Sequence, residues 1–346
     1  MDKKTGVGMI LAAVMLAVIV FWGYQHWRGS DNDRDELLSL MPASASAVVY
    51  VDLQALRNSP FLAGLFAWAP RPSVDADYAE FVQATGFNYE RDLDNLAIGI
   101  WNGAKEISFF ALADGRFDRK KITTYAMQSG TRTTERGREI FSATMSGSTR
   151  RISLAFMKDD RVAITDQPEL SKMLVENQKD ADAEDWRSRF ARLGGSPIFA
   201  VLREEAGAGG AVAALAPKGW RSPQLSALLD QLRWITLAGK PQGDRLEVVI
   251  EGESRAEGTA QQIADLLNGI LVLAQAGLND SKTRKELDPA ARDAYLELVR
   301  GADVSRIDRG ETESVRLVFE VTPKFLQAAQ TTPVKPIPAH PPKARR

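Results

Sequence analysis

One apolar segment near the amino terminus constrains this chain more than any other feature. Residues 7–24 read VGMILAAVMLAVIVFWGY, and no charged side chain occurs from Thr5 to Trp27. As a helix these residues would span about 27 Å, close to the roughly 30 Å hydrocarbon core of a bilayer. Because the segment is apolar on every side, it predicts a transmembrane helix rather than a buried core helix. We therefore expect residues 1–30 to form a membrane anchor.

The flanks of this segment predict its orientation. Lys3 and Lys4 precede it, whereas Trp22 and Trp27 mark its far end and an acidic stretch begins at residue 31. By the positive-inside rule the amino end stays in the cytoplasm and the body is extracytoplasmic. A cleaved signal peptide is the alternative, but bulky residues stand where a cleavage site needs small ones. The sequence thus predicts a single-pass protein of the inner (plasma) membrane.

Cysteine and histidine usage excludes whole classes of chemistry. The chain has no cysteine and only two histidines, His26 and His340, near its opposite ends. Disulfides, thiolate nucleophiles, cysteine-ligated metals and lipid-modified cysteines are therefore excluded. A body without imidazole also cannot assemble a Ser-His-Asp triad. We accordingly expect no cofactor and no metal, and we rank binding above catalysis.

The formal net charge of −1 hides an uneven distribution. Residues 1–30 contain three basic residues and one acidic residue, and residues 331–346 contain four basic residues and no acid. The body from 31 to 330 is left with 37 basic and 44 acidic residues. Nucleic-acid-binding domains carry basic surfaces, so this mildly acidic body predicts no nucleic-acid partner.

The body predicts an α+β fold in which two similar units of antiparallel sheet and helices follow the transmembrane helix. In the first unit, residues 31–176, β-branched and aromatic runs predict strands and amphipathic runs predict helices. The strands fall at 47–53, 96–101, 106–113, 139–143, 151–157 and 161–165, and the helices at 61–68, 78–85, 118–128 and 168–176. We expect the helices to cover one face of the sheet.

The second unit, residues 196–330, repeats this order. Its strands are expected at 197–202, 234–238, 245–251, 304–308 and 314–321, and its helices at 257–274 and 323–329. Such a repeat of elements indicates an internal duplication. The polar residues 177–195 form a linker with a short helix, and residues 331–346, which are basic and proline-rich, predict a disordered tail.

Three stretches resemble chemical motifs without completing one. Residues 31–36 begin like a calcium loop, but Glu36 and Pro42 stand where glycine and a bidentate glutamate are required, which favours a solvated spacer. Gly207, Gly209 and Gly210 are similar to a nucleotide-binding turn, but the third glycine of the fingerprint is missing. The apolar helix at 61–68 is either a partner-binding or membrane-surface helix or, as we favour, part of the core.

Carboxylates are the remaining candidates for catalysis. Glu90, Asp92 and Asp94, or Asp159 and Asp160, could supply an acid and a base as in glycosidases. Their spacing does not separate them from ordinary turn residues, whose side chains bind nearby backbone amides. The sequence therefore leaves catalytic residues unknown.

Two stretches carry a resemblance to a protein group. They are Met-Pro-Ala-Ser-Ala at 41–45, followed by VVYVDL at 48–53 and Leu56-Arg57, and TGFN at 85–88, followed by DLDNL at 92–96. In these the chain resembles uncharacterised bacterial envelope proteins that have one amino-terminal anchor and a duplicated α+β body. The resemblance implies an exported α+β body and brings no catalytic residues.

The features combine into one functional expectation. We expect a membrane-anchored, extracytoplasmic, non-catalytic binding or scaffolding module of the cell envelope, whose partner is an envelope protein or a wall polymer. The alternative is a carboxylate-dependent envelope hydrolase that acts on glycan.

Overall fold

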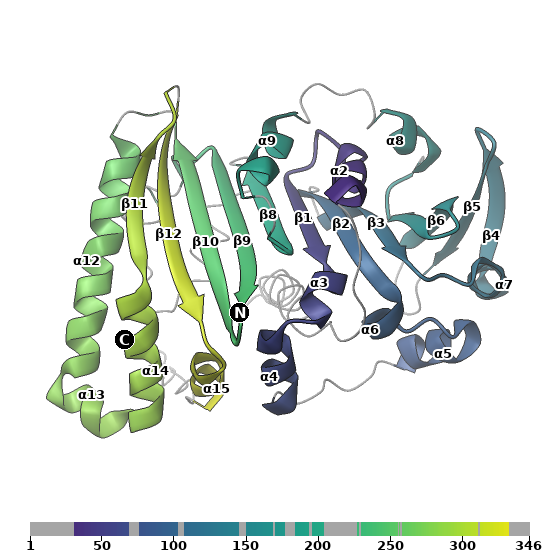
Figure 1. Cartoon of the computed structure of the whole chain (residues 1–346). Helices are drawn as coiled ribbons and strands as arrows, with labels where there is room; N and C mark the ends of the chain where they lie inside the picture. The colour runs from purple at the N-terminus through teal and green to yellow at the C-terminus, as the bar shows by residue number, and fades with distance from the viewer. Residues whose placement is uncertain are drawn as a thin grey trace, which may run out of the picture.

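The computed structural model describes most of the body of the protein (Figure 1). The described residues are 31–68, 76–102, 107–144, 150–168, 170–176, 184–193, 196–203, 227, 230–254, 256, 258–310 and 312–331. The predicted anchor at 7–24, the glycine-rich stretch at 207–210 and all but the first residue of the predicted tail lie outside these ranges. Within them, no helix has both the length and the apolarity needed to cross a membrane.

One antiparallel sheet of twelve strands contains the strands of both predicted units. Its order is β11-β12-β10-β9-β8-β1-β2-β3-β7-β6-β5-β4. β1 and β8 pair in the middle, with Val49 opposite Ala200, and thereby join the two halves of the chain. The α+β class with an antiparallel sheet is confirmed, and each predicted strand is found within three residues of its expected start.

The strands of the first half are β1 (Ala47–Asp52), β2 (Leu93–Asn102), β3 (Ile107–Gly115), β4 (Gly130–Glu135), β5 (Arg138–Thr144), β6 (Arg151–Lys158) and β7 (Arg161–Thr165). Those of the second half are β8 (Ile198–Arg203), β9 (Trp234–Gln242), β10 (Arg245–Ser254), β11 (Asp303–Asp308) and β12 (Glu313–Val321).

The helices before the central pairing are α2 (Asp31–Ser39), α3 (Leu53–Arg57), α4 (Pro60–Trp68), α5 (Ala76–Thr85), α6 (Tyr89–Asp92), α7 (Arg119–Ser129), α8 (Leu170–Glu176) and α9 (Glu184–Arg192). Those after it are α12 (Thr259–Asn279), α13 (Ser281–Glu286), α14 (Pro289–Gly301) and α15 (Pro323–Thr331).

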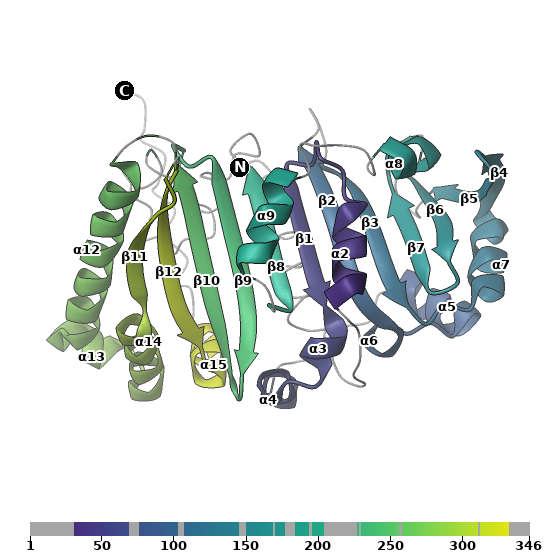
Figure 2. The same cartoon turned by 45° about the horizontal axis from the view of Figure 1, so that its top comes forward.

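Helices lie on both faces of the sheet, whereas the sequence predicted cover on one face only. On the face that we call the first face, Val48 and Tyr50 of β1 pack with buried residues of α2, α8 and α9. On the second face, Val51 packs with α3 and α4. Figure 2 shows α2 and α9 lying across the first face. The expectation failed because the central strands are apolar on both sides, and such strands need cover on both.

The differences from the predicted elements lie where hydrophobic patterning is weak. Residues 31–40, expected to be a polar spacer, form α2, and its Leu37 and Leu38 are buried in the core. β4 reads GTRTTE and is exposed along most of its length, so it shows no alternation that would predict a strand. It forms because β5 supplies its hydrogen-bonding partner. Tertiary contacts, and not the local sequence pattern, therefore determine the structure of both segments.

Candidate functional site

The two sequence stretches that resemble envelope proteins meet at one end of the first half of the sheet. Asp52 at the end of β1 pairs with Asn95 of β2, and the Tyr50 hydroxyl donates to Asn95 Oδ1 at 3.0 Å. Asp52 also caps α3 by accepting a hydrogen bond from Ala55 N at 2.7 Å. At the last residue of α3, Arg57 Nη1 lies 2.8 Å from Asp94 Oδ1. The motif residues are therefore parts of one structural cluster.

Arg57 is fully buried and organises this group. We define the Arg57 cluster as Asp52, Arg57, Arg91, Asp92, Asp94 and Arg116. Burial lowers the pKa of Arg57, and the hydrogen bond to Asp94 opposes that shift. Burial raises the pKa of Asp52, whose cap on α3 opposes the shift. With three arginines and three aspartates, the cluster is formally neutral.

Asp92, a predicted acid–base candidate, is held as a carboxylate inside this cluster. Its oxygens lie 2.7 Å from Arg91 Nη2 and 3.5 Å from Arg116 Nε, and Asn88 N donates to it at 2.9 Å. Burial alone would raise the pKa of Asp92, but the hydrogen bonds from Arg91 and Asn88 outweigh it and lower the pKa. A carboxyl held ionised in this way is suited to an ion pair rather than to proton donation.

The other sequence candidates do not join Asp92 and Asp94 in one site. Glu90 lies exposed on α6, where its backbone N–H donates to the cap residue Asn88. Asp159 and Asp160 are exposed in the turn between β6 and β7, and Arg119 Nη1 lies 3.9 Å from Asp159 Oδ1. Glu36 of the predicted acidic spacer pairs with Lys158 at 2.8 Å. Of the five candidates, the structure brings together only Asp92 and Asp94.

A second group of charges, which the sequence did not suggest, lies on the first face of the other half. Glu251 and Glu253 of β10 are each 2% exposed. Glu253 accepts from two arginines of α9, Arg189 at 2.6 Å and Arg192 at 2.5 Å. Glu251 accepts from Arg309 Nε at 3.0 Å and from Arg316 Nη2 at 2.9 Å. Every carboxylate oxygen in this pair of glutamates therefore faces a guanidinium group.

The ion pairs keep Glu251 charged in spite of its burial. Burial would raise the pKa of Glu251, but the hydrogen bonds from Arg316 and Arg309 outweigh that effect and lower the pKa. Gly252, between the two glutamates, faces the opposite side, where a Cβ would come within 2.7 Å of Leu232. The backbone between Glu251 and Glu253 is therefore closely packed against Leu232, which lies on the second face of the sheet.

An aromatic residue and a buried hydroxyl complete the group. Trp234 of β9 has Arg189 at 4.0 Å and Arg203 at 5.0 Å from its ring centroid, both within cation–π range. Ser314 of β12 is paired with Glu253 in the strand register and is 0% exposed. We define the Glu251 cluster as Arg189, Arg192, Arg203, Trp234, Glu251, Glu253, Arg309, Ser314 and Arg316.

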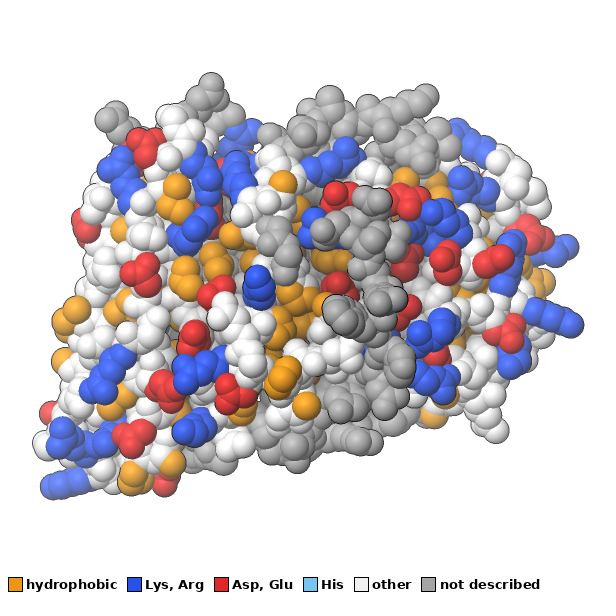
Figure 3. Space-filling view, viewed as in Figure 1, with side chains coloured by type: hydrophobic (Ala, Val, Ile, Leu, Met, Phe, Trp, Pro, Cys, Tyr) orange, Lys and Arg blue, Asp and Glu red, His pale blue; other side chains and the backbone are white. Residues whose placement is uncertain are grey.

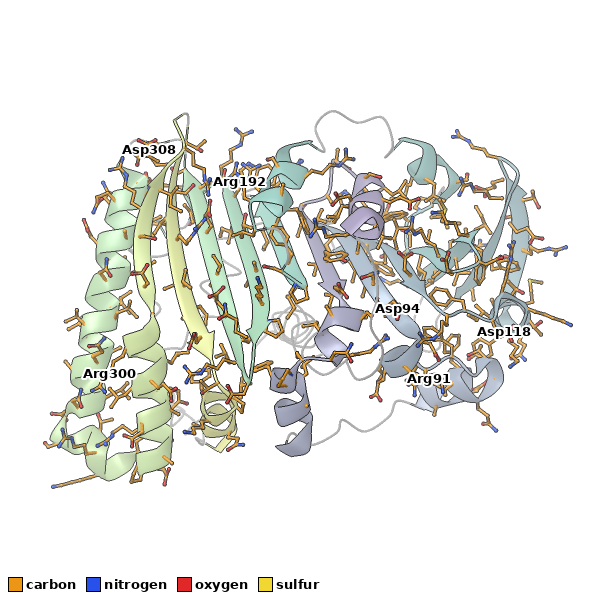
Figure 4. The ribbon with its side chains drawn as sticks, in the orientation of Figure 1. Arg91, Asp94, Asp118, Arg192, Arg300 and Asp308 are labelled. Carbon is orange, nitrogen blue, oxygen red and sulfur yellow. The ribbon has the colours of Figure 1, made fainter. Side chains whose placement is uncertain are left out.

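The two clusters lie far apart on the sheet. Figure 4 places Arg192 at the upper end of the second half, and Arg91 and Asp94 at the lower end of the first half. On the first face, Lys and Arg side chains gather over the upper ends of β10, β12 and β11 (Figure 3). Within the described ranges, no group of three or more acidic or histidine side chains is arranged to hold a metal ion.

One sequence signal could have indicated the Glu251 cluster. Glu251 and Glu253 are two residues apart in a strand, which places them on the same face. Charged residues at such positions are ordinarily exposed, so no local pattern indicates that these two glutamates are buried. Their partners come from α9, the residue after β11, and β12, and only the tertiary structure brings these elements together.

Comparison with known proteins adds a distant likeness. No protein-family model matches the chain, and no curated protein matches it significantly. Crystal forms I, III and IV of TP0453, an envelope-associated protein of Treponema, match with TM-scores of 0.43, 0.45 and 0.44 and identities of 10%, 12% and 12%. These matches cover 84–88% of this chain and 96–97% of TP0453. A likeness of this size carries no argument about function.

Proposed function

We propose that this chain is a single-pass membrane protein whose extracytoplasmic body is a non-catalytic binding or scaffolding module of the cell envelope. The apolar residues 7–24 and the charges around them support the anchor and its orientation. An internal duplication is part of the same proposal. The order β1-β2-β3 and β7 outward from the middle of the sheet is matched by β8-β9-β10 and β12 on the other side.

The observation that carries the binding role is the charged first face of the second half. Among the described helices, only α9 reaches this face of β9, β10 and β12, whereas α12, α14 and α15 belong to the second face. An extended sheet face lined by fixed charges is suited to a partner that lies along it. The lowered pKa of the buried Glu251 suits that carboxylate to an ion pair rather than to the proton donation that glycoside hydrolysis needs.

A sedimentation assay with insoluble cell-wall glycan tests this proposal against the hydrolase. We expect the purified full chain to release no soluble fragments from the glycan, either as wild type or as Asp94→Asn or Asp159→Asn. Release that is abolished by one of these changes, in a variant whose melting temperature is unchanged, would overturn the proposal. Asp159 is the cleaner position because its side chain is 97% exposed.

Partner and orientation are tested in cells. Crosslinking of the full chain, with and without residues 331–346, is expected to recover the same envelope partner from both, because the proposed surface lies in the body. A reporter fused after Arg346 is expected to be active outside the cytoplasm. Activity of that reporter only in the cytoplasm would contradict the orientation.

A further inference from the structure

The Glu251 cluster has an excess of positive charge that its own carboxylates do not balance. It contains five arginines, Arg189, Arg192, Arg203, Arg309 and Arg316, against two glutamates. The formal charge of the cluster is therefore +3. Asp308, the last residue of β11, is exposed, and its side chain accepts a hydrogen bond from Gly310 N at 2.9 Å. Like charges are gathered at a cost unless something anionic meets them.

The glutamates hold the guanidinium groups in fixed positions without using all of their donors. A guanidinium group carries five N–H donors, and a carboxylate cannot occupy them all. Arg192, Arg309 and Arg316 remain 29%, 23% and 31% exposed at their side chains. Their remaining N–H donors are therefore accessible at the rim of the cluster. The N–H donors on the inner side of each guanidinium group bind Glu251 or Glu253.

Two buried polar atoms in the cluster lack a partner among the described residues. Ser314 Oγ and Arg203 Nε are inaccessible to water and make no hydrogen bond there. Ser314 lies on the sheet face that Glu253 occupies. Buried polar atoms are ordinarily hydrogen-bonded, and those that are not call for a functional explanation. A ligand that offers several acceptor oxygens would meet this requirement and the charge excess together.

We propose that the Glu251 cluster is a binding site for a phosphate group, with Arg192, Arg203, Arg309 and Arg316 as its donors. Planar guanidinium forks match the geometry of phosphate oxygens, and a doubly charged oxyanion suits a cluster of charge +3. Arg189 and Trp234 act as positioning residues because they are buried beneath the rim. The inference rests on the proposed function, since it names the chemistry that the binding face recognises.

Titration calorimetry on the full chain in detergent micelles tests the site. Inorganic phosphate and the soluble phosphodiester glycerophosphoglycerol serve as probes, at a constant ionic strength maintained with chloride. Stronger binding of phosphate assigns the site to a free anion, and stronger binding of the diester assigns it to a polymer or a lipid headgroup. Binding of neither probe by the wild type would overturn the proposal.

Matched variants separate the site from general surface charge. We expect Arg316→Gln and Arg309→Gln to weaken probe binding about tenfold, as loss of a charge-assisted hydrogen bond should. The control is Arg245→Gln, on the same strand as Glu251 but paired with Glu320 at 2.6 Å, and it should change binding less than twofold. Equal affinities in all three variants would contradict the site.

Thermal melting provides a second measurement that can be made even if a variant is less stable than the wild type. It compares the rise in melting temperature that phosphate causes in each protein. Phosphate should raise the melting temperature of the wild type and of Arg245→Gln, because it binds only the folded state, and it should raise that of Arg316→Gln by less. An equal increase in Arg316→Gln would overturn the assignment. The two proposals can therefore fail separately. The phosphate site fails if the probes do not bind, whereas the proposed function fails if the chain releases glycan fragments.

Discussion

The two arginine clusters use the same residue types for opposite purposes. In the Arg57 cluster three aspartates face three arginines, and the central cation is completely buried in the core of the first half. In the Glu251 cluster the anions are the buried members, and the arginines around them outnumber them and reach solvent. A buried cation with matched acids stabilises a fold, whereas buried acids with excess cations position donors for a ligand.

The largest expected effect is on the Arg57 cluster. Arg57→Ala removes a fully buried guanidinium group and leaves Asp94 without its closest cation. Breaking a buried pair in this way should lower the free energy of unfolding by about 3–5 kcal/mol. Urea denaturation measures the loss. The control is Arg91→Ala in the same cluster, where the side chain is 62% exposed and the loss of stability should be much smaller. Equal losses would show that burial does not govern this cluster.

A smaller loss of stability is expected in the other cluster. Glu251→Gln keeps the size of the side chain but removes the charge that Arg309 and Arg316 share. Because both arginines can turn toward solvent, the free energy of unfolding should fall by about 1.5–3 kcal/mol. Urea denaturation should therefore rank Glu251→Gln below Arg57→Ala. The reverse ranking would show that the Glu251 cluster contributes more to the stability of the fold than the Arg57 cluster does.

The pH dependence of stability should also distinguish Glu251→Gln from the wild type. The pKa of Glu251 is lower in the folded protein than the ordinary value of 4.5, so the unfolded chain binds its proton more tightly. The stabilisation is therefore fully present above pH 4.5 and is lost as the pH falls through the folded pKa. Melting temperatures between pH 6 and pH 3 should fall less in Glu251→Gln. Parallel curves would show that Glu251 is not the titrating group.

The smallest expected change has the opposite sign. Ser314→Ala removes a buried hydroxyl that has no hydrogen-bond partner among the described residues. Stability should be unchanged or should rise by up to about 1 kcal/mol, because an unsatisfied polar group is lost. A clear loss of stability in urea would instead assign Ser314 a structural role.

The sequence predicted the fold best where patterning is strong. The strand at 47–53 and the helix at 61–68 were predicted, and the structure contains β1 and α4 at these positions, with Leu62 N donating to Ser59 Oγ at 3.3 Å. Phe61 and Leu62 are buried, as the favoured core interpretation of that helix requires. β4 was missed because its pairing with β5, and not its own pattern, stabilises it. α14 was missed although its start carries a local signal, the cap residue Asp288 followed by Pro289.

The candidate site was predicted only in part. Asp92 and Asp94 were singled out as carboxylates, but a sequence does not reveal that Arg57 and Arg116 lie beside them. The partners of Glu251 lie 58 and 65 residues away along the chain, so no local pattern links them.

The sequence by itself determined the α+β class, the antiparallel strands and the exclusion of cysteine and histidine chemistry from the body, since these follow from composition and local periodicity. Only the tertiary structure decided that both halves share one sheet, and that one set of acids is neutralised while another is surrounded by excess arginine. The physical reason is that the strength and role of a charge depend on its burial and on its neighbours in space. Pairing of β1 with β8 and packing of α9 on the sheet set those neighbours.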